Sequence, residues 1–68
     1  MSASTQVRLA NDIAAQFAHL DHDTAVTGIV AHLRDFWDPR MRAQLLAHVA
    51  DGGQGLDPLV REAAGRLA

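Results

Sequence analysis

The chain has 68 residues, no cysteine and a formal net charge of −2, and each of its six basic residues is an arginine. The absence of cysteine excludes thiolate zinc sites, iron–sulfur ligation and a cysteine nucleophile. Proteins that bind the phosphate backbone of nucleic acids need clustered positive charge, which this acidic chain lacks. No apolar run reaches the length of a signal peptide or a membrane span, so we expect a soluble, cytoplasmic protein.

The length allows one small domain, which we assign to residues 1–68. A chain of this size buries only about 60% of the surface that its unfolded form exposes. Scaffolds this small and without disulfides usually need very good helix packing, a metal or a partner. We therefore expect a binding partner.

The first expected helix runs from about Thr5 to Leu20. Its apolar residues recur at intervals of three and four, which places them along one face of a helix. These residues are Val7, Ala10, Ile13, Ala14, Phe17 and Leu20. Ser4 or Thr5 is the expected N-cap, because a hydroxyl can accept a hydrogen bond from the first turn. Leu9 lies off this stripe, which indicates a second contact surface.

The second expected helix runs from Thr24 to Trp37, with Asp23 as its N-cap. It has the most regular apolar stripe in the chain, formed by Val26, Ile29, Val30, Leu33, Phe36 and Trp37. His32 lies beside this stripe and is most simply a residue at the boundary of the core.

Two further helices are expected to begin at Asp38-Pro39 and Asp57-Pro58, because proline fits the first helical position and the preceding aspartate can cap it. The third helix should end near Ala50, before a glycine-rich turn. The expected stripes are Leu45, Leu46 and Val49 in the third helix and Val60, Ala63, Ala64 and Leu67 in the fourth. The sequences that flank the two dipeptides differ, so we predict no internal repeat. The sequence predicts an all-α fold, a compact or partly opened small single domain of three to four short helices.

The most metal-like cluster consists of His19, Asp21, His22 and Asp23. Histidine and carboxylate ligands three or four residues apart can converge on one ion. The cluster spans a turn between two helices, however, where polar residues are expected, and a fourth strong ligand is missing. We favour solvated turn residues over a metal site.

No pairing of a nucleophile with a base indicates catalysis, and a domain of this size can hardly form a deep cleft. The run Gly52-Gly53-Gln54-Gly55 resembles a phosphate loop only in its glycine content, because no strand precedes it and no lysine follows it. We therefore predict no catalytic, cofactor-binding or metal-binding residue in this chain.

Large side chains crowd the connection between the second and third expected helices. Tryptophan and arginine are enriched among binding hot spots. Arg40 and Arg42 lie at the start of a helix, where the macrodipole disfavours cations. They are either solvated and balanced by Asp35 and Asp38, or available to a carboxylate of a partner or to an anion. We predict that this connection is a partner interface, formed by Phe36, Trp37, Arg40, Met41 and Arg42. At least one of the two aromatic rings, Phe36 or Trp37, is expected to lie in the core.

Three blocks of the sequence carry a family resemblance. They are Val7-Arg8-Leu9-Ala10-Asn11-Asp12-Ile13-Ala14, Phe36-Trp37-Asp38-Pro39-Arg40-Met41-Arg42 and Gly55-Leu56-Asp57-Pro58-Leu59-Val60-Arg61-Glu62-Ala63. In this order they resemble the delta subunit of NAD-dependent, molybdenum-containing formate dehydrogenase, and the second block is the most specific. The first block departs from the family form, which often has methionine in place of Leu9 and glutamine in place of Asp12.

The resemblance implies a small cytoplasmic accessory subunit of a complex that oxidises formate to carbon dioxide and reduces NAD. In such complexes the catalytic alpha subunit carries bis-molybdopterin guanine dinucleotide and iron–sulfur clusters. The beta and gamma subunits carry FMN and further clusters. The delta subunit carries none of these groups, in agreement with the lack of cysteine. The resemblance implies a non-catalytic role in assembly, stability or molybdenum-cofactor maturation of the alpha subunit. The charge and the short apolar runs separately predict no nucleic-acid or membrane partner.

Two alternatives remain open from the sequence. The chain could be a transient maturation chaperone that leaves the mature enzyme, or a free-standing helical homo-oligomer with an unrelated regulatory role.

Overall fold

Four helices make up most of residues 2–67, and two of them begin at the Asp-Pro dipeptides. The computed structural model describes residues 2–67. The helices are α1 at Ser2–Phe17, α2 at His22–Phe36, α3 at Pro39–Ala50 and α4 at Pro58–Leu67, and no strand occurs within residues 2–67. The predicted all-α fold of three to four short helices is confirmed.

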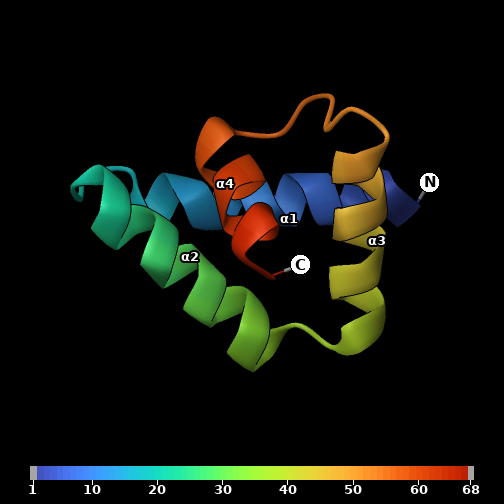
Figure 1. Cartoon of the computed structure of the whole chain (residues 1–68), viewed down its shortest axis with the longest axis horizontal. Coiled ribbons are helices and arrows are strands. Elements are labelled where there is room, and N and C mark those ends of the chain that lie inside the picture. Colours follow the sequence, from blue (N-terminus) through green and yellow to red (C-terminus); the bar gives the residue numbers. More distant parts are fainter. Residues whose placement is uncertain (1, 68) are drawn as a thin grey trace.

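Helices α1, α2 and α3 point in different directions, and α4 packs against all three of them. In Figure 1, α1 and α2 meet at the turn of residues 18–21 and diverge from it, while α3 stands beside the other end of α1. α4 lies in front of α1 and contacts each of the other three helices. The radius of gyration is 10.6 Å, close to the value of about 11 Å for a compact domain of this length. The structure is therefore compact and not partly opened.

The core lies where the four apolar stripes face one another. Its largest fully buried side chains are Ile29, Leu33, Leu45, Val26 and Val60. Among the residues whose burial is described, five of the buried ones are alanines, which allow the helices to approach closely but contribute little apolar volume. The predicted stripes are confirmed with three exceptions. Leu20 is 36% exposed and Phe36 is 74% exposed, and Leu46 is only half-buried and does not pack against this core. The core is well formed, but it is small.

Gly28 allows the end of α1 to pack against α2. A Cβ atom at this position would lie 2.5 Å from Cε1 of Phe17. The ring of Phe17 therefore occupies the space that a side chain on residue 28 would fill, and it closes the core near the turn that joins the two helices.

Two helix starts differ from the sequence prediction. α1 already begins at Ser2, so Thr5 lies inside the helix and not at its N-cap, and the side chain of Ser4 lies outside the described part. Asp21, and not Asp23, is the N-cap of α2. Its backbone is extended and its carboxylate accepts a hydrogen bond of 3.3 Å from the N–H of Thr24. The cap lies two residues earlier than predicted because Asp21 is the residue with the extended backbone that a cap requires.

The Thr24 contacts also affect the acidity of the cap. Hydrogen bonding from the side chain of Thr24, and then from its backbone N–H, lowers the pKa of Asp21 from the ordinary value of 3.8. A carboxyl group with a lowered pKa stabilises the fold above its ordinary pKa and loses this contribution as the pH falls through the lowered value.

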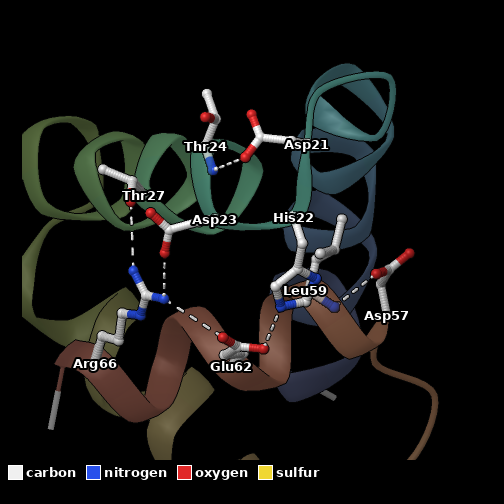
Figure 2. A network of polar contacts seen from close by, with 9 residues as sticks. All are labelled: Asp21, His22, Asp23, Thr24, Thr27, Asp57, Leu59, Glu62 and Arg66. Atoms are coloured by element: carbon white, nitrogen blue, oxygen red, sulfur yellow. Dashed lines mark hydrogen bonds and ion pairs between the residues drawn. The ribbon is translucent and has the colours of Figure 1, made fainter.

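The first turn of α2 is joined to α4 by a polar network on the surface (Figure 2). Nε2 of His22 lies 2.7 Å from Oε1 of Glu62, and Arg66 pairs with Asp23 at 3.1 Å and with Glu62 at 3.4 Å. Nη1 of Arg66 also donates to the hydroxyl of Thr27. Asp23, which is free of the capping role, thus helps to fix the orientation of α4 on α2.

Among the described residues, no helix combines the length and the hydropathy needed to cross a lipid bilayer.

Candidate partner interface

The two neighbouring aromatic residues of the predicted interface have opposite environments. Trp37 is 6% exposed and belongs to the core, whereas Phe36 is 74% exposed. The ring of Phe36 lies against the imidazole of His32, with centroids 4.9 Å apart. The expectation that at least one of the two rings lies in the core is confirmed, and the structure identifies that ring as Trp37.

The end of α2 explains this difference. Phe36 is the last residue of the helix and continues its apolar stripe beyond Leu33, the last residue of that stripe to be buried within the helix. α1 has diverged from α2 at this end (Figure 1), and Phe36 remains open to solvent. Trp37 has left the helix, and its extended backbone (φ −93°, ψ 138°) directs the indole into the core.

Arg42 lies in α3 but acts on the preceding helix. Its Nη1 donates to the carbonyl of Trp37, and also to those of Leu33 at 3.2 Å and Arg34 at 3.3 Å. The last carbonyls of a helix lack partners within it, and the negative end of the macrodipole favours a cation there. Arg42 is unfavourable for its own helix but favourable for α2, and the guanidinium fixes the angle between the two helices.

Arg40 has no comparable role in the described part of the chain. It is exposed, and its guanidinium forms no hydrogen bond or ion pair with any residue described. In particular, it pairs with neither Asp35 nor Asp38. The carboxylate of Asp38 instead accepts a hydrogen bond of 2.8 Å from the N–H of Met41, whose side chain packs against the core. Arg40 and Phe36 therefore remain exposed at this corner.

A second set of contacts, which the sequence did not predict, holds the loop before α4. The side chain of Asn11 donates to the carbonyl of Gly55 at 2.9 Å and accepts from the N–H of Asp57 at 2.9 Å. A carboxamide that uses both of its ends clamps this loop onto α1. These contacts join a residue of the first sequence block to a turn in the third block, and a single sequence carries no signal for a contact between such distant positions.

The predicted metal-like cluster does not converge. Asp21 caps α2, while His22 and Asp23 point toward α4 (Figure 2). Within residues 2–67, no three His, Asp or Glu side chains lie close enough to bind a metal ion together. No pocket is found on the surface of this part of the chain.

A family model described as "NADH-dependant formate dehydrogenase delta subunit FdsD" matches residues 6–64. The chain belongs to this delta subunit family. No curated protein and no solved structure matches the chain in the comparisons made. The family resemblance predicted from the three blocks is confirmed.

In this delta subunit, the three blocks are largely positions that hold the fold together. The first and third blocks meet through Asn11, and the second supplies Trp37 to the core and Arg42 to the end of α2. Two members of the second block have no comparable role within residues 2–67: Phe36, whose ring contacts His32 of its own helix but is largely exposed, and Arg40.

Proposed function

We propose that the chain is a non-catalytic accessory subunit that docks on the catalytic alpha subunit of an NAD-dependent formate dehydrogenase. There it supports assembly, stability or maturation of the molybdenum cofactor, in a cytoplasmic complex with beta and gamma subunits. The bis-molybdopterin guanine dinucleotide, the iron–sulfur clusters and the FMN are carried by these partners. The family match over residues 6–64 is the observation that carries this proposal.

The small core supports a role that depends on a partner. Among the described residues, five of the fourteen buried apolar residues are alanines, which contribute little apolar surface. A domain of this kind gains little stability from its own packing and benefits from apolar surface covered by a neighbour. We place the docking surface at the corner formed by Phe36, Trp37, Arg40, Met41 and Arg42. Phe36 is the most exposed large apolar residue of the described part, and the buried Trp37 supports the corner from the core.

Removal of the chain tests the proposed role. The dehydrogenase genes are expressed with and without the delta gene, and the molybdenum content per alpha subunit, the yield of complex and the formate-dependent reduction of NAD are measured. We expect the loss of the delta chain to lower molybdenum loading or complex yield, and activity in proportion. Equal loading, yield and activity in both preparations would refute the accessory role.

Native mass spectrometry of the active complex separates a permanent subunit from a transient chaperone. We expect a delta chain at a fixed ratio to the alpha subunit. An active, fully loaded complex without it would identify a chaperone that has left. Sedimentation of the isolated chain tests the homo-oligomer, which would appear as a folded dimer with no affinity for the dehydrogenase.

A further inference from the structure

The chain contains two corners built in the same way, and their comparison separates folding residues from others. We call residues 36–42 the first corner and residues 55–61 the second corner. Each has a buried apolar residue, then Asp-Pro, then two residues and an arginine. The buried residues are Trp37 and Leu56, which are 6% and 7% exposed.

The aspartates and arginines of the two corners also have matching roles. Asp38 accepts from the N–H of Met41, and Asp57 accepts from the N–H of Leu59 at 2.9 Å (Figure 2). Arg42 reaches back to carbonyls at the end of α2. Arg61 reaches back to the carbonyl of Gly53 at 3.0 Å. An Asp-Pro corner in this fold is therefore made from a buried apolar residue, a capping aspartate, a proline and an arginine that reaches back.

The two corners differ at the positions of Phe36 and Arg40. Gly55 stands in place of Phe36 and has φ +83°, and Leu59 stands in place of Arg40 and packs against the core. The second corner forms without an aromatic residue or a second arginine at these positions. Formation of the first corner therefore does not account for an aromatic ring that is 74% exposed or for a guanidinium without an ion pair among the described residues.

The charge around the first corner has the opposite sign to that of the whole chain. Residues 34–42 contain three of the six arginines and two of the eight acidic residues, although the formal net charge of the chain is −2. Asp38 is occupied as a cap and Arg42 is occupied by carbonyls. Arg34, Asp35 and Arg40 are exposed and together keep a net charge of +1 beside the apolar ring of Phe36. Such a surface complements an apolar pocket with a mainly acidic rim.

We propose that Phe36 is the anchor of the docking surface and that Arg40 binds a carboxylate beside the pocket that receives it. This inference rests on the proposed function and names the chemistry of the site on the catalytic subunit. Trp37, Met41 and Arg42 are positioning residues, because their side chains are engaged within the fold. Trp37 and Met41 pack in or against the core, and Arg42 donates to carbonyls at the end of α2. Insertion of an exposed aromatic ring into a pocket is the usual form of a binding hot spot, and rim charges mainly set the rate and the salt dependence of association.

The charges favour a different protein over a second copy of the chain. A two-fold contact through this surface would bring the basic corner of one copy against the same corner of the other. A standard interface also covers about 800 Å² on each partner, roughly a fifth of the 4106 Å² accessible surface of this chain. The corner is therefore the anchor of a larger contact with a larger protein.

The test measures the affinity of the full chain for the dehydrogenase complex prepared from cells without the delta gene. We expect Phe36→Ala to weaken binding by at least about tenfold, and Phe36→Leu to recover part of the loss. The matched control is Leu20→Ala, which truncates a residue that is 36% exposed in the turn before α2, far along the chain from the first corner, and should leave the affinity unchanged.

The charge is tested by Arg40→Gln with Arg8→Gln as its control, since Arg8 is also exposed. We expect Arg40→Gln to weaken binding several-fold and to reduce the dependence of the association rate on salt, because a rim charge steers association. Arg8→Gln should change neither quantity to the same extent.

The outcomes distinguish this inference from the proposed function. If the wild-type chain does not bind the complex, both fail. If the wild-type chain binds and restores molybdenum loading while Phe36→Ala and Arg40→Gln bind equally well, the proposed function stands and the anchor is refuted. Self-association that Phe36→Ala abolishes would identify a second copy as the occupant and overturn the inference. Thermal unfolding of each variant checks that the fold is intact. If Phe36→Ala is less stable than the wild type, the affinity of Phe36→Leu tests the anchor in its place.

Discussion

The two Asp-Pro corners share a backbone plan but are held in different ways. The second corner is clamped onto α1 by Asn11. Gly55 and Leu59, which stand where the first corner has Phe36 and Arg40, serve a turn and the core, respectively. The first corner lacks such a clamp among the described residues and depends on Arg42 and Trp37. Positions with matching roles in the two corners hold the fold, and Phe36 and Arg40, which have no such match, are the positions that we propose for recognition.

The largest effect is expected from the buried residue of each corner. Trp37→Ala should destabilise the chain by about 3–5 kcal/mol, and Leu56→Ala by about 2–4 kcal/mol, through lost burial and the cavity that remains. Proteins of this length have a total stability of only about 3–10 kcal/mol, so Trp37→Ala should leave much of the isolated chain unfolded. Circular dichroism during thermal and urea unfolding measures both. A Trp37→Ala chain with an unchanged melting temperature would contradict the core role of the indole.

The arginines that reach back should give the next largest effect, and an unequal one. Arg42→Ala removes hydrogen bonds to three carbonyls and should cost about 1–3 kcal/mol, whereas Arg61→Ala removes one and should cost about 0.5–1.5 kcal/mol. Arg42→Lys should recover only part of the loss, because its ammonium can donate to the same carbonyls but is more strongly hydrated and sits on a flexible stem. Urea unfolding of the three variants tests the order. Arg40→Ala is the matched control in the same helix, and an equal loss there would show that general charge, and not capping of α2, is responsible.

The Asn11 clamp should be specific to the second corner. Asn11→Ala removes both of its hydrogen bonds and should cost about 1–2 kcal/mol. Asn11→Asp keeps an acceptor for the N–H of Asp57 but loses the donor to the carbonyl of Gly55, so it should not restore stability. Amide hydrogen exchange locates the effect, since protection should fall at Asp57 and stay unchanged at Met41 in the first corner. Loss of protection at both corners would mean that they are not held independently.

The sequence predicted the features that depend on neighbours along the chain. Asp38-Pro39 and Asp57-Pro58 placed the starts of α3 and α4 correctly, because a proline and the cap before it act within one turn. The apolar stripes predicted the core for the same reason. Asp21 was missed as the cap of α2, because Asp23 is an equally good capping residue and only the backbone conformation distinguishes them.

The roles of the candidate site residues were harder to predict. Phe36 and Trp37 lie on the same stripe, and their opposite exposure depends on where α2 ends and α1 diverges. The macrodipole of α3 disfavours a cation at the position of Arg42, and a single sequence does not show that the guanidinium binds the carbonyls at the end of α2 instead. Asn11 joins backbone groups 44 and 46 positions away, a distance at which periodicity carries no information.

The smallest effect on stability is expected where the corners differ, and it provides the sharpest test of the comparison. Phe36→Ala and Arg40→Leu each make the first corner more like the second, and both side chains are exposed. Substitutions at such surface positions usually change stability by no more than about 0.5 kcal/mol. The two variants should therefore unfold at nearly the wild-type urea concentration but bind the dehydrogenase complex more weakly. If either of them destabilises the isolated chain as strongly as Arg42→Ala, the residue belongs to folding, and the separation of roles within the first corner is wrong.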